Sequence, residues 1–128
     1  MMFDPKFDFD RRRLHIRYSG FWSVEDARDV VDRFRAALRE VAASGRAFTL
    51  LDDLRSWPAQ SREVVDITKQ LPEIVRQMPV TRNAMIIEQA LLRLQVNRTL
   101  EGLANCAVFK TYEEADQWLS EVEPSPRL

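Results

Sequence analysis

Residues 47–53, with the sequence AFTLLDD, form a short apolar run that ends in two aspartates. A run of this length, bounded by polar residues, is typical of a strand that is covered on both faces. Residues 83–87 (NAMII) and residues 106–109 (CAVF) have the same character. Helical patterns separate the three runs, and strands that alternate with helices usually pair in parallel. The sequence therefore predicts a mostly parallel central sheet.

The two helical patterns on either side of the central run have recognisable ends. Ser23 is placed to cap the first helix, and Gly45 can adopt the left-handed conformation that stops it. Ser61 precedes the second helix. Pro72 lies inside that second pattern and lacks the N–H that a helix needs, so we expect a kink or a break near residues 70–71.

Two further helices and a hairpin complete the pattern. Leucines within residues 91–103 mark a third helix, which is predicted to end near Gly102. Thr111 opens a fourth helix with a capping box of the S/T-x-x-E type. At the start of the chain, apolar and polar residues alternate within residues 3–9 and 14–18, which predicts an antiparallel hairpin.

The predicted order is therefore β-β-α-β-α-β-α-β-α, an α/β fold in which the hairpin adds an antiparallel edge. We assign residues 1–120 to a single domain and residues 121–128, which contain two prolines, to a flexible tail. The chain does not open on a basic segment followed by an apolar core, and no apolar run reaches the roughly 20 residues of a membrane span. We therefore expect a cytoplasmic protein.

The composition argues against several classes of function. The chain has 128 residues, a formal net charge of -1, one histidine, one cysteine and three glycines. A net charge this close to zero does not indicate a surface that binds nucleic acid. Single copies of His and Cys cannot form a Cys/His metal site, and we expect no cofactor. The arginine run at residues 11–13 is interpreted as a solvated turn. Cys106 is interpreted as a small apolar side chain that packs inside the protein.

Three local patterns resemble a known family. They are residues 16–23 (IRYSGFWS), residues 48–52 (FTLLD) and residues 109–119 (FKTYEEADQWL). Together with the element order, they resemble the STAS domain of anti-sigma-factor antagonists, and more closely the SpoIIAA-like variants that occur as free-standing bacterial proteins. The resemblance extends from about Phe7 to Leu119. It implies a STAS fold, with a mostly parallel sheet covered by helices and an N-terminal antiparallel hairpin.

The same resemblance implies a candidate phosphoacceptor. In the phospho-regulated members an aspartate ends the central strand, and an Asp-Ser-x-Gly stretch opens the next helix. Asp52 or Asp53 matches the strand-end aspartate, and Ser61 matches the serine. Residues 59–63 (AQSRE) lack the flanking aspartate and glycine, which argues against a classical phospho-switch. The alternative for Ser61 is a structural helix cap.

Candidate site residues gather where the predicted strands end, because open α/β sheets place their ligand crevice at the carboxyl ends of the strands. Two aspartates end the central strand, one tryptophan lies near each of two strand-to-helix junctions, and the other two buried strands end in an acid and a base. We call this set the strand-end rim: Trp22, Asp52, Asp53, Trp57, Glu88 and Lys110. In the alternative interpretation, one carboxylate accepts loop amides, the other is solvated, and the tryptophans pack in the core.

Three functions compete on this pattern. The first is a non-enzymatic regulatory module that binds a regulatory protein or a second copy of the chain. The second is a domain that binds a small molecule or lipid in a cleft between helices and sheet, suggested by the apolar third helix and the irregularity at Pro72. The third is an enzyme that uses Asp52 and Asp53, but the chain lacks a phosphate-binding loop, a G-x-S-x-G elbow and a dinucleotide motif. The sequence favours the first function, with no catalytic residue.

Overall fold

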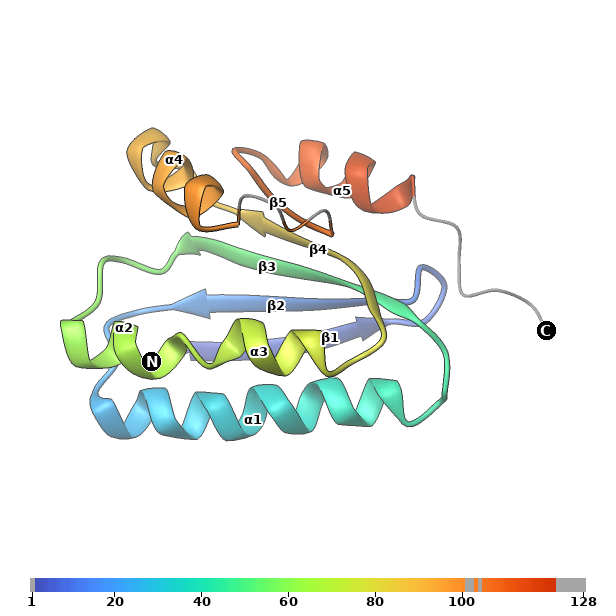
Figure 1. Cartoon of the computed structure of the whole chain (residues 1–128), viewed down its shortest axis with the longest axis horizontal. Coiled ribbons are helices and arrows are strands. Elements are labelled where there is room, and N and C mark those ends of the chain that lie inside the picture. Colours follow the sequence, from blue (N-terminus) through green and yellow to red (C-terminus); the bar gives the residue numbers. More distant parts are fainter. Residues whose placement is uncertain (1, 101–102, 104, 122–128) are drawn as a thin grey trace.

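The computed structural model of the chain describes residues 2–100, 103 and 105–121, and its elements follow the order β-β-α-β-α-α-β-α-β-α (Figure 1). The strands and helices are β1 (Met2–Asp8), β2 (Arg13–Ser19), α1 (Val24–Ala42), β3 (Phe48–Ser56), α2 (Arg62–Thr68), α3 (Leu71–Arg76), β4 (Val80–Ile86), α4 (Ala90–Thr99), β5 (Cys106–Phe109) and α5 (Tyr112–Ser120). The predicted α/β order is confirmed, with the second helix divided in two.

The five strands form one sheet in the order β1-β2-β3-β4-β5. β1 pairs with β2 antiparallel, and β2–β3, β3–β4 and β4–β5 are parallel pairs. This confirms the predicted hairpin at the edge of a parallel sheet. β3 is therefore the central strand, with a neighbour on each side along most of its length.

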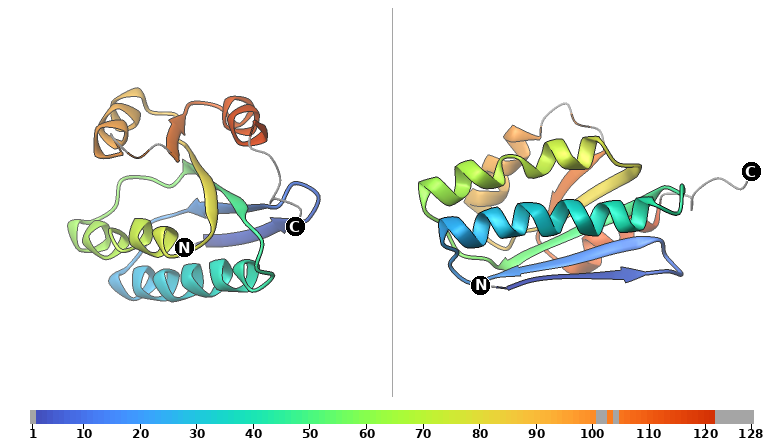
Figure 2. Two further views of the ribbon diagram at one scale, coloured as in Figure 1. Left: turned by 45° about the vertical axis from the view of Figure 1, so that its right-hand side comes forward. Right: turned by 90° about the horizontal axis from the view of Figure 1, so that it is seen from below.

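Helices cover both faces of the sheet (Figure 2). α1, α2 and α3 lie on one face, where Phe34 of α1 packs in a buried cluster with Ile16 and Leu50. α5 lies on the other face, where Leu119 packs in a second cluster with Leu51. Each apolar side chain buried in this way contributes roughly 1.5–3 kcal/mol to folding.

The helix ends follow the local signals in the sequence. Ser23 and Asp26 form a reciprocal capping box at the start of α1, and Gly45 follows that helix with a φ of 74°. Thr111 and Glu114 form the same capping box at the start of α5. Pro72 lies in the first turn of α3, so the predicted break falls between α2 and α3. These predictions are confirmed.

Three expectations about the elements need correction. β3 continues through Asp52 and Asp53 as far as Ser56, because both aspartates pair with β2 and β4 and Ser56 still pairs with Ser19 of β2. β5 is half-buried rather than buried, because it is an edge strand. α4 has no buried residue between Ala90 and Thr99, and the side chains of Leu91 and Leu94 are exposed.

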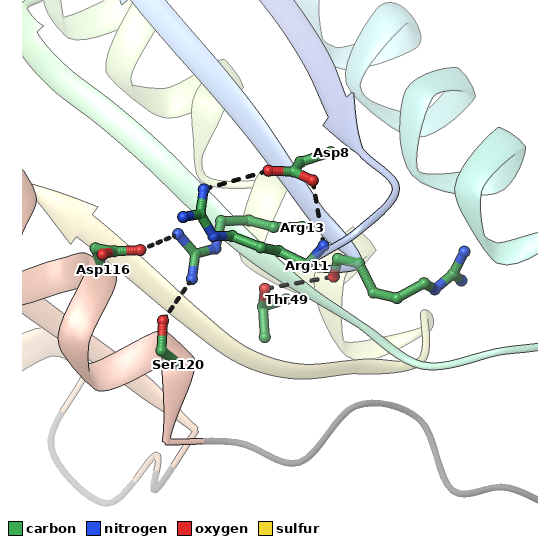
Figure 3. Close-up of polar contacts among 7 residues, drawn as sticks. Asp8, Arg11, Arg13, Thr49, Asp116 and Ser120 are labelled. Atoms are coloured by element: carbon green, nitrogen blue, oxygen red, sulfur yellow. Dashed lines mark hydrogen bonds and ion pairs between the residues drawn. The ribbon is translucent and has the colours of Figure 1, made fainter.

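The arginine run is not the solvated turn that we predicted. Arg13 is buried and donates hydrogen bonds to Asp116 at 2.6 Å and to Ser120 at 3.2 Å, so it connects the hairpin to α5 (Figure 3). Arg12 is also buried and donates to Ser44 at 2.8 Å. Only Arg11 of the three is exposed. Each long arginine stem can lie along the apolar protein surface while its head reaches a distant helix end, which a run of like charges does not reveal.

Two expectations fall on residues outside this description. Gly102, the predicted stop of the third helix, is not among the described residues, and neither is the predicted tail beyond Glu121. Within the described residues, no helix is both long enough and apolar enough to cross a membrane.

Candidate functional site

A cavity of about 300 Å³ lies on the face of the sheet that carries α1, α2 and α3. β2, β3 and β4 supply its floor, and α3 supplies much of one wall. The other wall consists of Val96 of α4, Cys106 of β5, and Leu100, Leu103 and Asn105 from between these two elements. Most of the lining is apolar. The lining residues are Tyr18, Trp22, Phe34, Asp52, Leu54, Trp57, Thr68, Leu71, Pro72, Val75, Arg76, Asn83, Met85, Val96, Leu100, Leu103, Asn105 and Cys106.

The position of Asp52 follows from the two-residue period of a strand. Successive side chains in β3 point to opposite faces of the sheet. Leu50 and Leu54 pack on the side of α1, and Asp52 between them lines the cavity. Leu51 packs under α5. Asp53 therefore lies on the α5 face, away from the cavity, and the two aspartates do not form a carboxylate pair.

Two neutral side chains hold the Asp52 carboxylate. The hydroxyl of Tyr18 donates to Oδ1 at 2.7 Å, and Nδ2 of Asn83 donates to Oδ2 at 3.0 Å. Asp52 is only 6% exposed. Burial raises the pKa of Asp52 from 3.8 to about 6, although the two hydrogen bonds favour the ionised form. Burial, together with the charge of Asp52, also raises the pKa of Tyr18 well above its ordinary value of 10.

Asp53 has a different environment from its neighbour. Nε of Arg55 donates to Asp53 Oδ1 at 2.9 Å and Nη2 of Arg55 donates to Oδ2 at 2.8 Å, while the backbone N–H of Arg55 donates to Oδ1 at 3.1 Å. Burial works to raise the pKa of Asp53, but the hydrogen bonds and charge of Arg55 outweigh it and lower the pKa. Asp53 thus has its counter-ion within the chain, and Asp52 has none among the described residues.

An aromatic cluster forms one end of the cavity. The rings of Trp22 and Trp57 meet edge to face with centroids 5.2 Å apart, and Tyr18 lies 6.1 Å from Trp22 and 6.4 Å from Trp57. Trp22 is buried and its indole N–H donates to the carbonyl of Ser19 at 2.9 Å. Trp57 is half-buried. The tryptophans therefore pack inward, as the alternative interpretation expected, but the space that they border is a cavity.

Gln60 connects the two loops that carry these tryptophans. Its Oε1 accepts from the backbone N–H of Trp22 at 2.8 Å, and its Nε2 donates to the carbonyls of Gly20 at 3.0 Å and Pro58 at 2.8 Å. Gln60 was not predictable as a functional residue, because a glutamine in a polar loop carries no pattern that separates it from solvated neighbours.

The strand-end rim does not form one surface. Trp22, Asp52 and Trp57 line the cavity, and Asp53 lies on the opposite face of the sheet. Glu88 and Lys110 are exposed beyond the ends of β4 and β5 and do not line the cavity. The structure therefore brings three of the six residues together.

The cavity also contains polar residues that the sequence analysis missed or interpreted differently. Asn83 is the first residue of an apolar run in the sequence. In the sheet it pairs with Leu50 of β3, and its side-chain amide donates a hydrogen bond to Asp52. Cys106 is half-buried and lines the cavity, and burial, with the charge of Asp52, raises the pKa of its thiol. The available signal for Asn83 was a polar residue at the start of an apolar strand run.

Ser61 caps α2, as one of the two interpretations expected. Its hydroxyl accepts from the backbone N–H of Val64 at 3.2 Å, and the residue is exposed and lies outside the cavity. Within the part of the chain that the structure describes, no three His, Cys, Asp or Glu side chains lie close enough together to hold a metal ion.

Comparison with solved structures identifies the fold. The chain is similar to the crystal structure of an uncharacterized protein of the DUF3478 family from Shewanella loihica PV-4, which has a SpoIIAA-like fold. The TM-score is 0.65 and the identity is 17%, over 92% of this chain and 92% of that chain. No family model and no curated protein matches the sequence. The chain thus has a SpoIIAA-like fold, as the resemblance of its sequence implied.

Proposed function

We propose that this chain is a non-enzymatic binding module whose cavity takes a small and largely apolar molecule. The observation that carries the proposal is the cavity of about 300 Å³ between the sheet and α3 and α4. Pockets for small molecules are concave, mostly apolar and furnished with a few polar groups that fix orientation. This cavity has that composition, with Asp52, Tyr18 and Asn83 as its polar cluster.

The positions of the tryptophans favour a small ligand over a protein partner at this place. A protein-binding hot spot presents a large aromatic side chain to the partner. Trp22 is buried instead, and Trp57 packs against it. Both rings border a concave space of the size that suits a small molecule.

No nucleophile with an adjacent base is present in the described wall of the cavity, which supports a binding role. His15 lies on the other face of the sheet, near Tyr112 and Asp53. The Cys106 thiol stays protonated because burial, with the charge of Asp52, raises its pKa. Asp52 is held by Tyr18 and Asn83, and no second acid of the described lining stands opposite it to share acid–base work.

A protein-binding regulatory role, with a partner protein or a second copy of the chain, is a second candidate. The exposed leucines of α4 favour it, since Leu91 is 69% exposed and Leu94 is 51% exposed. Val96 of the same helix lines the cavity. Light scattering on the full chain and on Leu91→Glu tests self-association. If the original chain and the variant are both monomeric, a second copy of the chain is not the partner.

Octanol is a suitable neutral probe for the cavity. We expect octanol to bind saturably, as measured by isothermal titration calorimetry. Val96→Phe places a larger side chain at the cavity wall and should weaken binding, whereas Leu94→Phe alters the same helix outside the lining and should not. Equal binding by both variants would contradict the proposal, and so would the absence of any saturable heat.

A further inference from the structure

Asp52 is the one acidic side chain in the described lining of the cavity, and it has no cationic partner there. Its hydrogen-bond partners, the Tyr18 hydroxyl and the Asn83 amide, are both neutral. By contrast, Asp53, the next residue, is paired with Arg55 at 2.8 Å. A buried carboxylate is usually paired with a cation, so the environment of Asp52 calls for an explanation.

The one cationic side chain of the described lining, Arg76, does not supply a positive charge next to Asp52. Arg76 lies on α3, and its Nη1 pairs with Oε2 of Glu73 at 3.0 Å. The Arg76 side chain is 62% exposed. Its guanidinium is therefore directed to solvent at the edge of the cavity, while Asp52 lies in the floor formed by the sheet.

The surroundings of Asp52 suit a cation that enters with a ligand. A positive group that donates hydrogen bonds to a carboxylate in a poorly solvated site makes a stronger interaction than a neutral donor does. The rings of Tyr18, Trp22 and Trp57 also border the cavity, and aromatic faces attract organic cations. The rest of the lining is mainly apolar and can bury only an uncharged body.

We propose that the cavity selects amphiphilic organic cations, in which a protonated amine donates hydrogen bonds to Asp52 and an apolar body fills the space between the sheet, α3 and α4. This selectivity rests on the proposed function, because it concerns the same cavity. It goes beyond that function by assigning the head group of the ligand and the side chain that recognises it.

Three probes with the same eight-carbon body test the assignment: octylamine, octanol and octanoate. We expect octylamine to bind at least about tenfold more tightly than octanol, and octanoate to bind most weakly, as measured by calorimetry near neutral pH. Binding of octanol and octylamine with equal affinity would overturn the cation selectivity and leave the cavity function standing. So would a preference for octanoate. If none of the three probes binds, the proposed function fails and the selectivity fails with it.

Two adjacent residues provide the matched variants. Asp52→Asn keeps the size of the side chain and removes its charge, so the preference for octylamine over octanol should disappear. Asp53→Asn makes the same chemical change on the opposite face of the sheet, and the preference should remain. A preference that persists in Asp52→Asn, or disappears in both variants, would overturn the assignment.

The unaltered protein provides a second readout that does not depend on how a variant folds. The affinity for octylamine should rise between about pH 5 and about pH 7.5, because burial raises the pKa of Asp52 to about 6 and the cation binds its ionised form. Other titratable or charged groups that line the cavity are Tyr18 on β2, Cys106 on β5 and Arg76 on α3, while the lining residues of α1, α2 and α4 are uncharged. The pKa values of Tyr18 and Cys106 are shifted upward, away from this window. An octylamine affinity that stays constant over this window would contradict the assignment.

Discussion

Asp52 and Asp53 are consecutive residues of β3, yet Asp52 lines the cavity under α3 while Asp53 pairs with Arg55 on the opposite face of the sheet. The two carboxyl groups therefore differ in both partner and acidity. Burial raises the pKa of Asp52, whereas the hydrogen bonds of Arg55 lower the pKa of Asp53 against the effect of burial. A pair that resembles an acid–base dyad in the sequence is in fact two separate sites.

The first prediction concerns how Asp52 makes stability depend on pH. The pKa of Asp52 is about 6 in the folded protein and near 3.8 in the unfolded chain. Its contribution therefore favours the folded state fully below about pH 4 and is lost as the pH rises through about 6, a change of about 3 kcal/mol. Because Asp52→Asn cannot titrate, the free energy of unfolding of the variant relative to the original protein should rise by about that amount between about pH 4 and about pH 8. Urea unfolding at a series of pH values measures this difference, and a constant difference would contradict the prediction.

The second prediction concerns the ion pair between the hairpin and α5. Asp116→Ala leaves the buried guanidinium of Arg13 without its carboxylate partner at 2.6 Å. Since Asp116 itself is one-third exposed, we expect a loss of about 1–3 kcal/mol in the free energy of unfolding. Glu73→Ala breaks the exposed pair with Arg76 and should cost less than about 1 kcal/mol. Equal losses in the two variants, measured by chemical unfolding, would show that Arg13 is not buried as described.

The third prediction concerns Ser61. Ser61→Ala removes the acceptor for the backbone N–H of Val64 and should lower the free energy of unfolding by about 1 kcal/mol. Ser61→Asp keeps an acceptor at the helix start and should restore most of that loss. Thermal unfolding of the three proteins checks the cap. Mass spectrometry of the protein from its native cells tests phosphorylation separately, and the absence of phosphate on Ser61 would leave only the structural role.

The fourth prediction concerns Gln60. Gln60→Ala leaves the backbone N–H of Trp22 and the carbonyl of Gly20 without their partner. We expect a loss of about 1–3 kcal/mol in the free energy of unfolding and a change in tryptophan fluorescence, because the loops that carry Trp22 and Trp57 lose the hydrogen bonds of the Gln60 side chain. Gln95→Ala changes an exposed glutamine of α4 and is the control. An effect of Gln60→Ala no larger than that of the control would contradict this role.

Much of the fold was predictable because helix ends, the helix break and the hairpin are each marked by a local sequence signal. The helix cap at Ser23, the capping box at Thr111, the break before Pro72 and the alternation in the hairpin each act over a few residues, and all of them are confirmed. The end of β3 was placed too early because charged residues usually mark a loop. In this sheet, Asp52 and Asp53 pair with both neighbouring strands, and pairing with β2 alone continues to Ser56.

The site was less predictable because it depends on distant pairs. Tyr18 and Asp52 are 34 residues apart, and Asn83 and Asp52 are 31 apart. Their contacts depend on the register of β2, β3 and β4, which could not be predicted from the sequence. Arg13 reaches Asp116 across 103 residues. In each case the two polar partners are far apart in the sequence and are brought together only by the tertiary structure.

The most direct test of the cavity as a binding site is an NMR measurement of intermolecular nuclear Overhauser effects between octanol and the methyl groups of the protein. The account predicts contacts from octanol to Leu71, Val75 and Val96, which line the cavity. It predicts none to Leu51 and Leu119, which pack on the opposite face under α5. Contacts confined to the exposed Leu91 and Leu94 of α4, or an absence of contacts to Val75 at saturating octanol, would contradict the account.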